Sequence, residues 1–89
     1  MNVLPLISEF LGTFLLLLSI LATGNAFVIG ATLVIIILLI GGVSGAHVNP
    51  AVSVAMYLKG ALSLNELLAY SAAQVVGGAS ALYAYKSFA

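Results

Sequence analysis

Asn49, Pro50 and Ala51 combine an amide side chain with the start of a helix, and they follow a polar, glycine-containing segment at residues 44–48. Proline suits the first position of a helix because its missing N–H would have no partner there. The Asn49 side-chain oxygen can accept hydrogen bonds from the next free backbone N–H groups, which leaves its NH₂ group to donate to a small polar molecule. The helix dipole adds about half a positive charge at this end. The three residues therefore predict a site that favours neutral, hydrogen-bonding solutes over cations.

The helix that begins at Pro50 is short. It extends over residues 50–58, and Lys59 and Gly60 then supply the cation and the glycine that are typical of a helix C-terminus. About nine residues at ~1.5 Å each give roughly 14 Å, about half of the ~30 Å hydrocarbon core of a bilayer. Helix ends at membrane depth occur only where they are buried in protein or line a water-filled cavity. We therefore expect a re-entrant half-helix beside a pore or binding site; the alternative is an Asn-Pro turn without a pore.

The composition indicates that these residues lie in a membrane. The chain has 89 residues, of which 64% are hydrophobic, and its mean hydropathy is +1.33. It contains two lysines, two glutamates and no arginine. Because no basic face is available to neutralise phosphates, we expect no nucleic-acid partner. The absence of cysteine excludes disulfides and thiolate metal sites.

Three longer apolar segments are each long enough to cross a bilayer. The first also resembles a secretion signal, but the basic N-terminal region is missing and Glu9 lies inside the segment, so we interpret it as a retained helix. Together with the half-helix, the segments predict an all-α membrane protein with three transmembrane helices. The predicted spans are residues 4–22, 26–43 and 64–85.

The third predicted span has a capping box at its start and small residues repeated along its length. Ser63 and Glu66 match a capping box, in which a serine side chain and a glutamate three residues later satisfy two backbone N–H groups. Small residues at intervals of four allow helix backbones to approach closely in lipid, although alanine and glycine are also common in membrane helices in general. These small residues are Ala69, Ala73, Gly77 and Ala81.

Three motifs, in this order along the chain, resemble those of the aquaporin and glycerol-channel family, also called the major intrinsic proteins. They are SEFLGTF at residues 8–14, SGAHVNPAV at residues 44–52 and AQVVG at residues 73–77. Members of that family have six spans and two half-helices, arranged as an inverted repeat. Residues 1–89 resemble a single half-repeat, the first. The resemblance implies that an antiparallel homodimer completes the aquaporin-like fold.

The resemblance also implies roles for individual residues. Residues 49–51 correspond to the pore motif of the family. Glu9 corresponds to a first-span glutamate that accepts hydrogen bonds from the loop before the half-helix, and Gln74 corresponds to a residue that braces the same loop from the third span. We expect both to act as scaffold residues. His47 corresponds to a histidine that lines the pore vestibule; a purely structural role in the loop is the alternative.

This sequence departs from the family at the selectivity filter, the narrow part of the family's pore. Typical members have an arginine after the second Asn-Pro-Ala, whereas Val52 follows the motif here and the chain has no arginine. Counting back from Asn49 by the family's spacing places Ile29 and Ile37 near the other filter walls, with Ala46 close by. A symmetric dimer would therefore carry the same apolar ring at both ends of its pore.

The function implied by the resemblance is a passive channel for water and small neutral solutes such as glycerol, with no enzymatic activity, cofactor or metal. Its partners would be the lipid bilayer and a second copy in the opposite orientation, with four such dimers associating. Lys59 and Lys86 lie on opposite sides of the predicted bilayer, so the positive-inside rule gives almost no orientation bias. Two alternatives stay open: a small dual-topology exporter that uses Glu9 for proton exchange, and a fragment or structural subunit that does not conduct.

Overall fold

Four helices make up the computed structural model, which describes residues 2–89. They are α1 (Val3–Thr23), α2 (Ala26–Ile40), α3 (Pro50–Lys59) and α4 (Leu64–Phe88). Two of them, α1 and α4, are long and apolar enough to cross a membrane, whereas α2 is a shorter apolar helix.

Each helix begins at a residue whose side chain accepts a backbone hydrogen bond. The side chains of Asn2, Asn25 and Asn49 cap α1, α2 and α3, and Pro50 occupies the first turn of α3. The capping box of α4 is present, with Ser63 Oγ accepting from the Glu66 N–H and Glu66 Oε1 accepting from the Ser63 N–H. Local side-chain chemistry therefore sets where the helices start.

The second apolar segment is only partly α-helical. The sequence predicts a span over residues 26–43, whereas α2 ends at Ile40 and is 15 residues long, about 22 Å at ~1.5 Å per residue. Residues 41–44 form turns, and the Ile40 carbonyl accepts from both the Val43 and the Ser44 N–H groups, a shared bond that is common at helix ends. Gly41 and Gly42 stand at this point, and glycine weakens the helical state relative to other residues.

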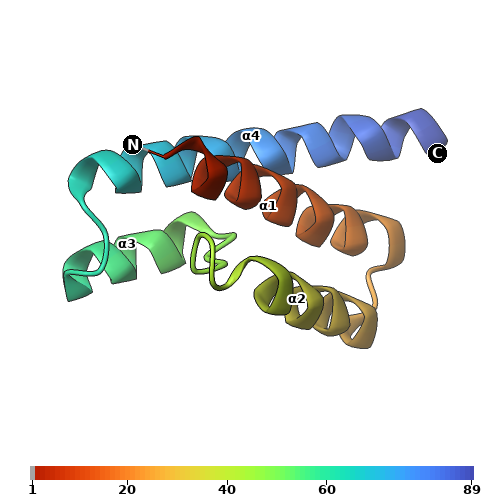
Figure 1. The fold of residues 1–89 in the computed structure, drawn as a ribbon. Coiled ribbons are helices and arrows are strands. Elements are labelled where there is room, and N and C mark those ends of the chain that lie inside the picture. The colour runs from red at the N-terminus through yellow and green to blue at the C-terminus, as the bar shows by residue number, and fades with distance from the viewer. Residues whose placement is uncertain (1) are drawn as a thin grey trace.

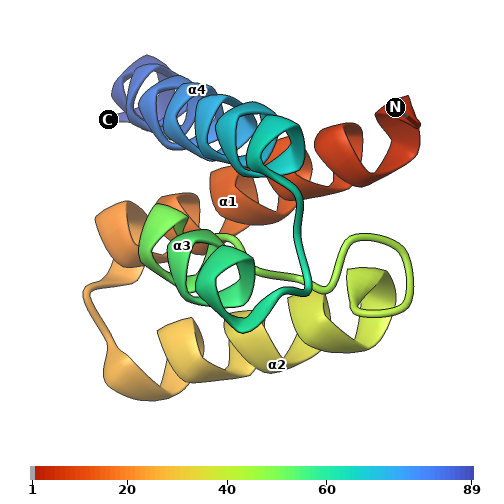
Figure 2. The same ribbon diagram turned by 90° about the vertical axis from the view of Figure 1, so that its left-hand side faces the viewer.

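The helices are arranged so that α3 begins near the middle of the molecule. Figure 1 shows α1 and α4 running in the same direction, α2 running back, and α3 extending from the middle to the end where α4 starts. Turned by 90°, the structure shows α2 and α3 lying below α1 and α4 (Figure 2). Helix α1 packs against α4 and α2, and α3 packs against α4, whereas among residues 2–89 no such contact joins α2 to α3.

Two glycines allow close packing around the loop before α3: Gly77 on α4, which faces α1, and Gly12 on α1, which faces the loop. A Cβ atom at Gly77 would lie 2.5 Å from the Phe10 carbonyl oxygen, so α4 crosses α1 where no side chain fits. A Cβ atom at Gly12 would lie 2.7 Å from Val48 Cγ1, on the side that faces the loop. The small hydrophobic core lies beside Gly12 and consists of Ile36, Ala46 and Val48, with Leu16, Leu33 and Ile40 packed against it.

Candidate functional site

The Glu9 carboxylate is fully buried, with 0% of its surface exposed, and it binds the loop that leads to α3. Its Oε2 accepts hydrogen bonds from the His47 N–H at 3.0 Å and from Ser44 Oγ at 2.6 Å. Its Oε1 accepts from the Val48 N–H at 2.7 Å and from Gln74 Nε2 at 2.8 Å. Each partner is a donor, which suits a carboxylate that only accepts. A single side chain of α1 thus joins the loop to α4.

The loop held by Glu9 has an unusual backbone. Ala46 and Val48 adopt positive φ angles of 50° and 47°, and Gly45 has a φ of 89°. Positive φ is rare for a β-branched residue such as valine and costs roughly 1–2 kcal/mol. The Val48 side chain is buried in the core, and its N–H bonds to Glu9, so packing and the carboxylate together offset this strain. The left-handed turns place Asn49 directly at the start of α3.

A second set of hydrogen bonds connects the loop to α3 and α4. Gln74 Nε2 also donates to Ser53 Oγ at 2.9 Å, and Ser53 Oγ lies 2.8 Å from His47 Nδ1. The His47 ring packs against Tyr70, with 5.1 Å between ring centroids, and Tyr70 donates its hydroxyl proton to the Ser44 carbonyl. His47 is only 9% exposed within one chain, so its ring belongs mainly to the packing beneath the loop.

Asn49 is exposed at the N-terminus of α3, and its side-chain oxygen accepts the Ala51 N–H at 2.8 Å. Because Oδ1 serves as the helix cap, the Nδ2 group is the part of the side chain left to bind another molecule. Asn49 and Pro50 border a groove of about 420 Å³ between α1 and α4, whose walls also include Thr13, Val48 and Gln74.

The structure separates the filter candidates within one chain. Ile29 is half-buried and Ile37 is 49% exposed on α2, and Val52 is half-buried on α3. Helices α2 and α3 do not pack against each other in the described residues, so Ile29 and Ile37 are not in a common packed cluster with Val52. Ala46 is buried in the core beside Ile36, which lies next to Ile37 in the sequence.

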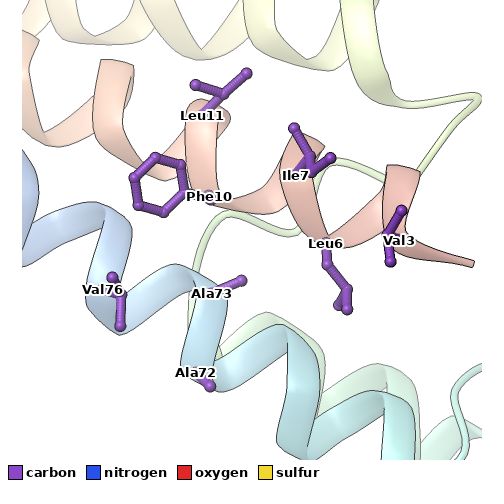
Figure 3. Close-up of a pocket in the computed structure, with 8 residues that line it drawn as sticks. All are labelled: Val3, Leu6, Ile7, Phe10, Leu11, Ala72, Ala73 and Val76. Atoms are coloured by element: carbon purple, nitrogen blue, oxygen red, sulfur yellow. The ribbon is translucent and has the colours of Figure 1, made fainter. Parts of the chain in front are cut away.

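A second groove, of about 830 Å³, lies between α1 and α4 and includes none of these residues. Figure 3 shows that its eight lining side chains are all hydrocarbon. A surface without polar side chains cannot orient a hydrogen-bonding solute, so we place the candidate site at Asn49 instead.

Three residues of the hydrogen-bonded network have no role predicted from the sequence: Ser44, Ser53 and Tyr70. A spacing signal exists for two of them. Ser53 lies four residues after Asn49, and Tyr70 lies four residues before Gln74, so each shares a helix face with a predicted residue. Among residues 2–89, no group of three or more histidine, cysteine, aspartate or glutamate side chains could hold a metal ion.

Comparisons with known proteins agree with the motifs. The Major intrinsic protein family matches residues 21–88. The chain is 36% identical over 93 residues to the glycerol uptake facilitator protein-like 6 of Lactiplantibacillus plantarum, an alignment that covers 92% of this chain and 42% of that protein. It is 37% identical to aquaporin NIP1-1 of Arabidopsis thaliana over 81% of this chain and 29% of that protein. Aquaglyceroporin AqpS of Rhizobium meliloti is 36% identical over 80% of this chain and 37% of that protein.

No solved structure matches the chain. The chain spans less than half the length of the curated relatives described above. The family resemblance drawn from the three motifs is confirmed by the match, and so is the membrane location, which the two long apolar helices also support. Members of this family are membrane channels rather than enzymes, and residues 21–88 show that this chain belongs to the Major intrinsic protein family.

Proposed function

We propose that the chain is a half-channel that pairs with an oppositely oriented copy to conduct water and small neutral solutes such as glycerol. The observation that carries the proposal is the start of α3 near the middle of the molecule, where Asn49 is exposed and its oxygen is committed to the helix cap. A lumen at this point would meet a neutral donor and the positive end of a helix dipole. Neutral molecules with lone pairs bind there, and cations are repelled.

The proposed pore needs a second half-helix, because residues 2–89 supply one. Helix α3 is 10 residues long, about half of a bilayer. An antiparallel copy would bring a second α3 N-terminus toward the first, in the manner of inverted repeats around a midplane site. The side chains of Ile29 and Ile37 on α2 and of Val52 on α3 are then available to line the lumen, since α2 and α3 do not pack together.

Osmotic water flux and glycerol uptake in proteoliposomes test the proposal. Asn49→Ser keeps a capping oxygen but replaces the two Nδ2 protons by one hydroxyl proton on a shorter side chain, so α3 stays formed while solutes lose a hydrogen bond. We expect the purified parent to conduct water without ionic current, and Asn49→Ser to conduct less by about tenfold, the effect of losing one hydrogen bond of about 1.4 kcal/mol.

The matched control is Asn65→Ser, because Asn65 is an exposed asparagine in the first turn of α4. This variant is expected to conduct like the parent. The proposal fails if the assembled parent passes neither water nor glycerol, if it carries ions freely, or if the two serine variants conduct equally.

The antiparallel arrangement predicts that both ends of the chain are found on both sides of the membrane. The chain contains no cysteine, so single cysteines at Ala61, between α3 and α4, and at Ala89, at the other end of the molecule, report the two sides separately. With a membrane-impermeant maleimide we expect about half of each variant to react before lysis, since two balanced lysines give no orientation bias.

A single orientation would give a different pattern: one cysteine variant would react fully and the other would not react until lysis. That pattern, without a partner chain of the opposite orientation, contradicts the homodimer.

A further inference from the structure

The Ser53 hydroxyl lies between two nitrogen atoms, one from Gln74 and one from His47. Its Oγ atom is 2.9 Å from Gln74 Nε2 and 2.8 Å from His47 Nδ1, and the residue is 0% exposed. Among residues 2–89, Ser53 Oγ forms no other hydrogen bond. A hydroxyl donates one proton and can also accept, so its two contacts need directions.

The Gln74 amide donates to Ser53, because its orientation is fixed at Glu9. The carboxylate oxygens of Glu9 only accept, and Oε1 lies 2.8 Å from the Gln74 amide. If the amide were turned over, two acceptor oxygens would face each other at this distance. Nε2 is therefore the atom beside both Glu9 and Ser53, and its NH₂ group donates one proton to each. Ser53 accepts this bond, so its own proton needs an acceptor elsewhere.

His47 Nδ1 is the acceptor within reach of that proton. Water does not reach the fully buried Ser53, and Nδ1 is the remaining hydrogen-bond partner of its Oγ in the described residues. If Nδ1 carried a proton itself, Ser53 would accept twice and its buried hydroxyl proton would have no partner, which is costly. The contacts therefore favour an unprotonated Nδ1.

The other ring nitrogen of His47 remains open to the outside. Among residues 2–89, Nε2 forms no hydrogen bond, and it does not belong to the polar atoms that are both unpaired and shut off from solvent. A Cβ atom at Gly45 would lie 3.0 Å from Nε2, so the glycine leaves this edge of the ring uncovered. In a neutral imidazole whose Nδ1 accepts, the proton is on Nε2.

We propose that Ser53 donates to His47 Nδ1 and is a positioning residue that holds His47 in the tautomer with its proton on Nε2. The donors then follow one direction, from Gln74 to Ser53 to His47, and the Glu9 carboxylate sets that direction. His47 Nε2–H offers a neutral donor to an oxygen atom outside the network. That this oxygen belongs to a passing water or glycerol molecule rests on the proposed function, whereas the tautomer rests on contacts within one chain.

Nitrogen magnetic resonance measures the tautomer directly, because His47 is the only histidine of the chain. The full chain, with isotope-labelled imidazole nitrogens, is placed in lipid nanodiscs at a pH well above neutrality, where histidine is neutral. In the parent we expect the Nε2-protonated form to dominate. Ser53→Ala removes one hydrogen bond of ordinary strength, so the ratio of the Nε2-protonated to the Nδ1-protonated form should fall about tenfold.

The matched control is Ser87→Ala, because the Ser87 hydroxyl on α4 is exposed and bonds to the Tyr83 carbonyl. It is expected to keep the tautomer ratio of the parent. A readout in the parent does not depend on any variant: the Ser53 hydroxyl proton should exchange slowly and show a through-space contact to the His47 ring, while the Nε2 proton should exchange faster with water.

Three results would overturn the proposal. The first is a dominant proton on Nδ1 in the parent, and the second is a Ser53 hydroxyl proton without a contact to the His47 ring. The third is an unchanged tautomer ratio in Ser53→Ala. None of these measurements uses solute flux, so the channel proposal and this one can fail separately.

Discussion

Glu9→Leu is expected to disorder the loop before Asn49 and to abolish assembly. Leucine removes both carboxylate oxygens and with them four hydrogen bonds, from the Ser44 hydroxyl, the His47 and Val48 N–H groups and one proton of the Gln74 amide. The His47 and Val48 N–H groups have no second acceptor among the described residues. Each stranded donor costs about 1–3 kcal/mol. A small domain has about 5–15 kcal/mol of total stability, so the loss is large by comparison.

Hydrogen exchange of the loop amides measures the effect directly. In the parent we expect slow exchange at the His47 and Val48 N–H groups, and in Glu9→Leu fast exchange together with loss of the dimer. Glu66→Leu is the control, because the only other glutamate of the chain is engaged in the capping box of α4, which is worth about 1 kcal/mol. Parent-like assembly and protection in Glu9→Leu would show that the carboxylate does not brace the loop.

Glu9→Gln separates the brace from the exporter alternative. Glutamine keeps one acceptor oxygen but cannot release a proton near neutral pH. If the chain exchanges protons through Glu9, this variant should lose proton-driven transport while the His47 and Val48 amides remain protected. If Glu9 is a scaffold residue, it should instead show weakened protection and a proportional loss of water flux.

Gly77→Ala is the second substitution for which we expect a large effect. The added Cβ would meet the Phe10 carbonyl oxygen at 2.5 Å, and because that neighbour is backbone, no change of rotamer relieves the contact. Helices α1 and α4 must separate, and overpacking of this kind costs about 1–3 kcal/mol. Separation also lengthens the 2.8 Å bond between Glu9 and Gln74, so water flux is expected to fall together with stability.

Gly30→Ala provides the comparison at a glycine that packs against nothing. Beyond its chain neighbours and the backbone of its own helix, no atom lies within 4 Å of a Cβ built at Gly30, in the first half of α2. Alanine is favoured over glycine inside a helix by up to about 1 kcal/mol, so this variant should be as stable as the parent or more so. Unfolding equilibria of both variants in the same lipid check the difference. Equal stability of Gly77→Ala and Gly30→Ala would contradict the close crossing of α1 and α4.

Local chemistry made the helix starts predictable. The hydrogen bonds of each cap join residues at most three positions apart: Asn49 with Ala51, and Ser63 with Glu66. Such bonds depend on local sequence alone, so they can be predicted without the tertiary structure. The membrane location can also be predicted, because hydropathy depends on which residues the chain contains and not on how it folds. The end of α2 was harder to predict from the sequence, because Gly41 and Gly42 weaken the helix without fixing the residue at which it stops.

The site itself depends on contacts between residues far apart in the chain. Glu9 meets Val48, 39 residues away, and Gln74, 65 residues away, and the residue types at these positions do not say which donors will reach which oxygen. The left-handed backbone conformation of Val48 could not be predicted from the sequence either, because valine disfavours positive φ angles. Both features arise from packing. Gly77 lets α4 approach α1, and Gly12 leaves room for the Val48 side chain. Both contacts are needed for the buried Glu9 carboxylate to face the N–H groups of the strained loop.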